Sequence, residues 1–236
     1  MRISPKGNIN INGGFMRPSF CQGLPSLGMV SLKFHVAASR LQIPVNSSMR
    51  SITVEGVEIG EARNYIAEEY LKMDPLPKYL FFLGDDMLPQ WDALIELWKE
   101  METGKWDMLS GLYYLKQEPP EPLLRRRNIP GSLKVGIHYE IGEVIPVDVT
   151  GLDFCLIKPE VFHKISKPFF KTGFAEYPDN TVSHTVNGKK SPTKTAIVMH
   201  TEDTYFFNQM IEKKMAIGVH TGVRIAHYDH KSGLVY

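Results

Sequence analysis

Two adjacent carboxylates directly follow a short apolar run in the stretch YLFFLGDDML, residues 79–88. Asp85 and Asp86 repel each other and would lose hydration at the rim of a core, so a cation is expected beside them. Carboxylate oxygens at the end of a strand suit Mg²⁺ or Mn²⁺, which usually share their ligand shell with substrate phosphates. The alternative is a turn whose aspartates favour the start of the next helix. The residues alone leave both interpretations open.

Further ionisable side chains occur late in the chain. His227 ends the apolar run GVRIAHY at 222–228. Alone it would be structural or solvated, whereas an imidazole beside a diacid favours Mn²⁺ over Mg²⁺. Glu202 and Asp203 fall in the first turn of a helix that Thr201 opens, where acids complement the helix dipole. A carboxylate held there is also placed to accept a proton, so the two acids are candidate catalytic residues.

A cation stands where the helix dipole disfavours one. Arg63 falls in the first turn of an expected helix at 61–71. A guanidinium at a helix start would bind phosphate oxygens through paired hydrogen bonds. Pairing with Glu58 or Glu61 is the structural alternative.

Composition and missing motifs exclude several classes of protein. The 236 residues carry a formal net charge of +1, so no overall field attracts nucleic acid or an anionic membrane, although local basic patches remain possible. Cys21 and Cys155 have neither the number nor the spacing of a metal ribbon or a disulfide framework. No apolar run approaches the roughly 20 residues that span a bilayer, and the first residues lack the apolar core of a signal peptide. Dinucleotide-binding, P-loop and nucleophile-elbow motifs are also missing. We therefore expect a soluble cytoplasmic protein.

The periodicity predicts a single α/β domain over residues 1–236. Strands are expected at 79–83, 106–114, 143–157 and 222–228. Helices are expected at 61–71, 91–101 and 201–215. We expect Pro89 to lie in the first turn of the second helix, Gly218 to end the third, and Gly151 to interrupt the strand at 143–157.

The alternation of these elements indicates a mixed, mostly parallel sheet flanked by helices. Ligands bind beyond the carboxyl ends of the strands in such sheets, which is where Asp85 and Asp86 fall. Residues 116–134 and the polar stretch 171–200 are expected to be loops, the second one ordering when a ligand binds.

Four segments in this order resemble the GT-A nucleotide-sugar glycosyltransferases, especially the small stand-alone members related to family-two enzymes, including those of phages. The segments are GEARNYIAEEYL, FFLGDDMLPQWDAL, SGLYY and TEDTYFFNQM…GVRIAHYDH. The resemblance covers roughly residues 50–230. It implies a GT-A (Rossmann-like) fold with a donor-binding half at about 1–115 and an acceptor-side half at about 116–236.

The resemblance also implies roles for individual residues. The acidic strand end corresponds to a DxD-like motif that holds a divalent metal, Mn²⁺ or Mg²⁺, on the donor diphosphate. The last acid of that motif is Asp86, and the late His227 completes the metal shell. The acidic helix start supplies the general base, which falls on Asp203 with Glu202 in support.

Other matches place residues on the two substrates. Arg63 and Asn64 of the ARN segment face the nucleotide, and Gly151 falls on the acceptor side. The first acid of DxD would fall at position 84, where this chain has Gly84. That acid usually helps to hold the nucleotide portion of the donor, and Asp85 is the candidate substitute.

The predicted function is a metal-dependent glycosyltransferase that moves a sugar from a nucleotide-diphosphate donor to an acceptor hydroxyl, with inversion. A non-catalytic nucleotide- or carbohydrate-binding module on the same fold is the alternative. A metal phosphohydrolase would need a second metal site, for which acids and histidines are too few. The acceptor, a glycan or a small molecule, stays open. The basic run LLRRRN at 123–128 also leaves DNA open, or a solvated face.

Overall fold

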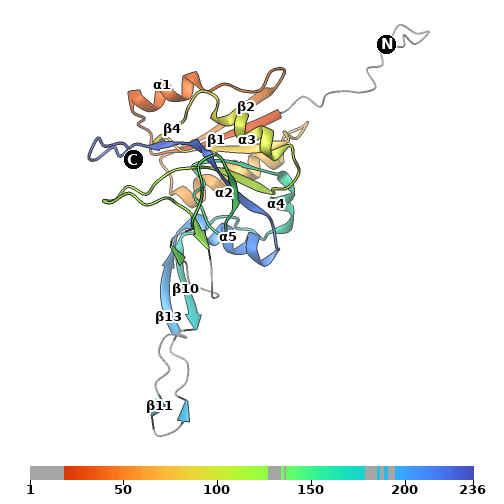
Figure 1. Ribbon diagram of the computed structural model, residues 1–236. Helices are drawn as coiled ribbons and strands as arrows, with labels where there is room; N and C mark the ends of the chain where they lie inside the picture. The colour runs from red at the N-terminus through yellow and green to blue at the C-terminus, as the bar shows by residue number, and fades with distance from the viewer. Residues whose placement is uncertain (1–18, 127–133, 136, 179–184, 187–188, 191–194) are drawn as a thin grey trace, which may run out of the picture.

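A computed structural model describes residues 19–126, 134–135, 137–178, 185–186, 189–190 and 195–236 (Figure 1). One seven-stranded sheet forms its centre, and strands from both halves of the sequence alternate within it. In spatial order the strands are β2 (Ser48–Glu55), β1 (Ser19–Ser26), β3 (Tyr79–Leu83), β9 (Phe154–Ile157), β5 (Met108–Leu112), β14 (Ile217–Arg224) and β8 (Val144–Pro146).

Most strands of the sheet run in one direction. β2, β1 and β3 are parallel, and β14 is parallel to β5. β9 lies antiparallel between β3 and β5, while β8 is antiparallel to β14 at the edge. The predicted mixed, mostly parallel α/β sheet is therefore confirmed. The orientation of β9 matters for function, because this strand begins at the sheet edge where its neighbours end.

Helices cover both faces of the sheet (Figure 1). Phe34 of α1 and the buried side of α3 share one hydrophobic cluster, while α2, α4 and α5 contribute to the other. The helices are α1 (Leu32–Arg40), α2 (Ile59–Leu71), α3 (Ala93–Met101), α4 (Pro159–Lys164) and α5 (Glu202–Glu212). None of the helices in the described ranges has the length and apolarity that crossing a bilayer requires.

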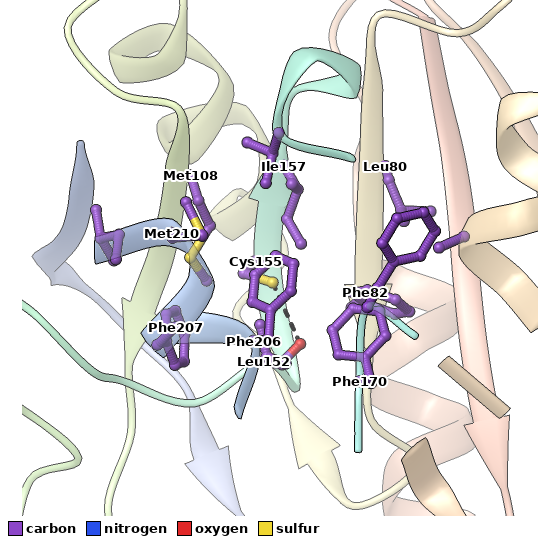
Figure 2. Packing of buried hydrophobic residues seen from close by; sticks show 14 of the residues in the cluster. Leu80, Phe82, Met108, Leu152, Cys155, Ile157, Phe170, Phe206, Phe207 and Met210 are labelled. Atoms are coloured by element: carbon purple, nitrogen blue, oxygen red, sulfur yellow. Dashed lines mark hydrogen bonds between the residues drawn. The ribbon is translucent and has the colours of Figure 1, made fainter. Parts of the chain in front are cut away.

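The core below α5 is aromatic. Figure 2 shows Phe206, Phe207 and Met210 gathered with Cys155, whose thiol donates to the carbonyl of Leu152 over 3.3 Å. The ring of Phe206 also stacks on that of Phe170, with centroids 4.7 Å apart. Burial raises the pKa of the Cys155 thiol, so this side chain packs as a small apolar group. The packing fixes the start of α5 against the sheet.

Local sequence explains the helix that carries Arg63. The Glu58 carboxylate accepts the backbone N–H of Glu61 over 3.0 Å and so caps α2. Ala62, Ile66 and Tyr70 recur at helical spacing and are buried. The predicted helix at 61–71 is thus confirmed and starts two residues earlier.

Four two-stranded sheets lie beside the central sheet within the described residues. They pair β4 (Met87–Leu88) with β15 (Ala226–His227), β6 (Arg125–Arg126) with β7 (Lys134–Val135), β10 (Gly173–Pro178) with β13 (Thr195–His200), and β11 (Thr185–Val186) with β12 (Lys189–Lys190). The β10–β13 hairpin projects from the body of the molecule (Figure 1). The expectation of a loop at 171–200 was wrong at both ends of this segment, because residues 173–178 pair with residues 195–200. Residues 179–184, 187–188 and 191–194 lie outside the described residues, and the ordering on ligand binding stays a prediction.

Three predicted boundaries were also wrong. Pro89 precedes α3, because β4 pairs with β15 and the helix begins only after Asp92. α5 ends at Glu212, where Lys214 adopts a left-handed conformation with φ 55°, and Gly218 lies inside β14. The strand expected at 222–228 is split between β14 and β15.

We predict that Phe206→Ala lowers the free energy of unfolding by about 3–5 kcal/mol, because it opens a cavity among stacked rings. Chemical denaturation monitored by circular dichroism would measure this change. The matched control is Tyr65→Ala on α2, whose side chain is exposed and should matter little. Equal losses for the two variants would contradict the proposed aromatic core.

Candidate functional site

A pocket of about 410 Å³ opens where several strands of the sheet end. It lies beyond the carboxyl ends of β1, β2 and β3, as expected for an open α/β sheet. Asp85, Asp86, Arg63 and Glu202, four residues singled out from the sequence, meet here. The lining residues are Pro25, Ser26, Leu27, Val57, Glu58, Ile59, Arg63, Gly84, Asp85, Asp86, Asp153 and Glu202.

Arg63 lies at the floor of the pocket and is only 2% exposed. Its two terminal nitrogens pair with Asp153 and with Glu202. Burial opposes the charge on Arg63, yet the two carboxylates outweigh it and raise the guanidinium pKa. The expected pairing with Glu58 or Glu61 is replaced by these two acids. The guanidinium therefore holds α2, the start of β9 and α5 together.

The two carboxylates share one cation and stay partly uncompensated. Burial raises the pKa of Asp153 and of Glu202, although Arg63 acts in the opposite direction on both. Each carboxylate therefore depends on Arg63 to stay charged in this buried place.

Asp153 is a pocket residue that sequence reasoning missed. The Gly84 N–H donates to the carbonyl of Asp153 over 2.7 Å, and a Cβ at position 84 would lie 2.8 Å from Cβ of Asp153. A glycine at 84 therefore makes room for a carboxylate from the neighbouring strand. The available signal was an acid directly before the apolar run FCLI, but β9 had to be recognised as antiparallel to place it at this edge.

Asp85 and Asp86 face different partners. The Ser26 hydroxyl donates to the Asp85 carboxylate over 2.7 Å. The Asp86 carboxylate accepts from the ammonium of Lys116 and lies 3.3 Å from Nε2 of His227. Burial raises the Asp86 pKa, but His227 and Lys116 outweigh it and lower the pKa to about 2. The cation expected beside the acidic pair is thus Lys116, a residue that the sequence did not indicate.

The orientation of His227 bears on metal binding. Its Nδ1 lies 2.8 Å from the backbone oxygen of Tyr114. A carbonyl can only accept, so Nδ1 carries a hydrogen and donates it to Tyr114, which leaves Nε2 as the ring nitrogen that faces Asp86. A histidine metal ligand has this arrangement, with its other nitrogen bonded to a carbonyl. Within the described residues, no three His, Cys, Asp or Glu side chains are grouped to hold a metal ion. An ion held by Asp86 and His227 would have to take its other ligands from substrate or water.

Asp203 lies outside the lining of the pocket. Its carboxylate accepts from the Thr201 hydroxyl and from the Thr204 N–H, the latter over 2.7 Å. These contacts complete the first turn of α5, a role that acids favour at helix starts. Glu202, one residue earlier, points into the pocket instead.

Asn64 and Gly151 have contacts that explain them structurally. The Asn64 amide donates to the carbonyl of Phe170 over 2.7 Å and accepts its N–H over 3.1 Å. A Cβ on Gly151 would lie 1.6 Å from the Tyr113 hydroxyl oxygen, so only glycine fits beside this buried ring. The same hydroxyl accepts the N–H of Asp153 over 3.1 Å. Gly151 thereby positions the residue that pairs with Arg63.

The basic run at 123–128 lies partly outside the described residues. Arg125 pairs with Glu121 at 3.6 Å, and Arg126 donates to the carbonyl of Pro146 over 3.2 Å. Both guanidinium groups are thus engaged within the protein, and neither contact tests whether DNA is the acceptor.

Comparison with known proteins bears on the fold. No protein-family model matches the chain, and neither does any curated protein. The crystal structure of A197 from STIV is similar, with a TM-score of 0.59, 19% sequence identity and 93% of each chain covered. At this identity the likeness shows the fold alone.

We predict that Arg63→Met destabilises the protein by about 3–5 kcal/mol at neutral pH, since it leaves two carboxylates unpaired. The variant should regain stability as the pH falls, because protonation removes these charges. The native pKa values of Asp153 and Glu202 lie above the ordinary values of 3.8 and 4.5. As the pH falls from neutral, the stability of the variant should therefore begin to rise before the pH reaches these ordinary values. Urea denaturation across this pH range would measure it.

Lys72→Met is the matched control, because Lys72 ends the same helix and its side chain is 66% exposed. It should leave stability nearly unchanged at every pH. An Arg63→Met variant as stable as this control would show that the buried bridge is unimportant.

Proposed function

We propose that the protein is a metal-dependent glycosyltransferase that moves a sugar from a nucleotide-diphosphate donor to an acceptor hydroxyl. The observation that carries the proposal is the strand-end pocket, which gathers Asp85, Asp86, Arg63 and Glu202 from three separate segments. These are residues to which the family resemblance assigns donor, metal and catalytic roles. The similarity in fold to A197 supports the architecture and carries no activity.

The charge of the pocket favours a metal. Five of its lining residues are acids, against the single guanidinium of Arg63, which is already paired with two of them. A diphosphate would be repelled by this surface unless a cation accompanied it. Asp86 and His227 would hold that ion, Mn²⁺ or Mg²⁺, once the Lys116 ammonium moves from the carboxylate. The ion would offset the negative charge on the leaving diphosphate.

The chemistry required of the chain is one proton transfer and one displacement. The acceptor oxygen forms a bond to the anomeric carbon as the bond from that carbon to the diphosphate oxygen breaks, and a carboxylate takes the acceptor proton. We assign the base to Asp203, with Glu202 in support. A single displacement of this kind inverts the anomeric configuration. We assign Asp85 and Arg63 to binding of the donor.

One observation favours the alternative of a binding module without turnover. Both terminal nitrogens of Arg63 are engaged with Asp153 and Glu202, and position 84 has no carboxylate of its own. A donor could then bind without being activated. Hydrolysis of a nucleotide sugar in the presence of Mn²⁺ discriminates between the two functions, because a binding module would leave the donor intact.

We predict that Mn²⁺ and a nucleoside diphosphate bind together and that neither binds tightly alone. Isothermal titration with UDP and GDP, with and without a chelator, would measure this coupling. Asp86→Asn should remove the effect of the metal. Asp229→Asn, which changes a half-buried aspartate two residues after His227, should retain it. Nucleotide affinity that is indifferent to the chelator would argue against the metal site.

We predict that Asp203→Asn lowers sugar transfer by about 10²-fold or more, within the range for general bases, while metal-dependent donor binding persists. Glu202→Gln is the informative comparison, because Glu202 lines the pocket and contacts Arg63. A larger loss in Glu202→Gln would move the base to that residue. Product NMR should show inverted configuration, and retained configuration would defeat the mechanism without removing the metal site.

A further inference from the structure

Large apolar side chains are exposed on α1, on the loop before it and on the segment before α3. Leu27, Met29 and Leu32 are 86%, 87% and 77% exposed, and Trp91 is 56% exposed. Val30 and Val36 add to the same stretch. Helix α1 buries only Phe34, which is little for a helix of nine residues. We call the surface made by Leu27, Met29, Val30, Leu32, Val36 and Trp91 the α1 face.

The α1 face contains a groove with cations beside it. About 850 Å³ of space lies between α1 and residues 88–92, lined by Leu32, Val36 and Trp91. Lys33 and Arg40 also line it, against one acid, Asp92. Figure 1 shows α1 at the periphery of the molecule, next to β4. The apolar residues and the cations are therefore available to a partner from outside.

Acidic and basic residues are unevenly distributed along the sequence, although the net charge of the chain is near zero. Not one Asp or Glu occurs before Glu55. The same stretch contains six basic residues: Arg2, Lys6, Arg17, Lys33, Arg40 and Arg50. An excess of one sign in one part of a chain indicates an oppositely charged partner.

We propose that the α1 face docks the protein on an anionic lipid bilayer. Interfacial helices combine exposed leucine, valine and tryptophan with lysine and arginine, so that apolar groups enter the headgroup region while the cations meet lipid phosphates. Trp91 and Leu32 are the apolar groups that would enter the headgroup region, and Lys33 and Arg40 are the cations that would meet the lipid phosphates. The groove between them gives an acyl chain an apolar surface to lie against.

Other occupants fit the α1 face less well. A second copy of the chain in a two-fold dimer would bring its own Lys33 and Arg40 against the same surface, and like charges would meet. Nucleic acid would satisfy the cations, but its phosphates would leave Leu27, Met29 and Leu32 uncovered. A lipid surface satisfies both kinds of side chain.

The α1 face also adjoins the proposed active site. Leu27 belongs to it and lines the strand-end pocket as well. The Lys33 ammonium lies 4.6 Å from the ring centre of Tyr228, whose N–H donates to the backbone oxygen of Asp86 over 2.8 Å. A bilayer on this face would therefore lie beside the mouth of the pocket. The docking itself does not depend on the proposed function, since binding can be measured without turnover.

The test is flotation of the full chain with vesicles of phosphatidylcholine alone or mixed with phosphatidylserine. We expect binding to the mixed vesicles that weakens with added salt, together with a blue shift in tryptophan fluorescence that Trp91→Phe abolishes. The pair Leu32→Ser with Trp91→Ser, and the pair Lys33→Ala with Arg40→Ala, should each weaken binding about tenfold or more.

Matched controls are Ile141→Ser, an exposed isoleucine outside the α1 face, and Lys72→Ala, an exposed lysine on α2. Both should bind like the unmodified protein, and thermal unfolding should show that every variant is folded. Failure to bind the mixed vesicles, or equal binding by all variants, would overturn the proposal. So would a dimer in solution that the α1-face variants dissociate, or DNA binding that they abolish, in the absence of lipid binding.

Discussion

The site depends on one buried guanidinium shared by two carboxylates. Arg63 joins α2 to the start of β9 through Asp153 and to α5 through Glu202. Removing either acid would leave the other paired with Arg63. Removing Arg63 would leave two buried carboxylates without a counterion. Gly84 and Gly151 follow from the same constraint, because each gives space to Asp153 or to the Tyr113 ring beside it. The glycines and the charges thus form one unit.

The ion pairs of the site limit what the pocket can bind. Its cations already have partners, because Arg63 pairs with two acids and Lys116 pairs with Asp86. An anionic ligand therefore gains little from the protein unless it arrives with a cation or displaces an internal pair. Nucleotide binding coupled to a divalent ion would meet that requirement, and the ion is proposed to bind between Asp86 and His227, whose Oδ2 and Nε2 lie 3.3 Å apart.

The sequence predicted those parts of the site that depend on local pattern. The apolar run at 79–83 placed Asp85 and Asp86 at a strand end, and helical spacing placed Arg63 on α2. The sequence could not show whether Glu202 or Asp203 faces the pocket. Neighbouring helix residues point about 100° apart, and only packing sets which of them faces inward. Asp153 was missed because its position depends on β9 running antiparallel. β1 was missed because Gly23 and Pro25 are unfavourable inside a strand. The strand forms because β2 and β3 pair with it on both sides.

Charge is separated along the chain and also in space. The basic residues before Glu55 include Lys33 and Arg40 beside the α1 face, while the acids that line the pocket all come later in the sequence. An anionic bilayer would attract the first surface and repel the second, so the two forces together would orient the molecule with α1 against the lipid and the pocket opening beside it. Leu27 lies at the boundary, on both surfaces. In that orientation Ser26 and its partner Asp85 would lie on the side of the pocket nearest the bilayer.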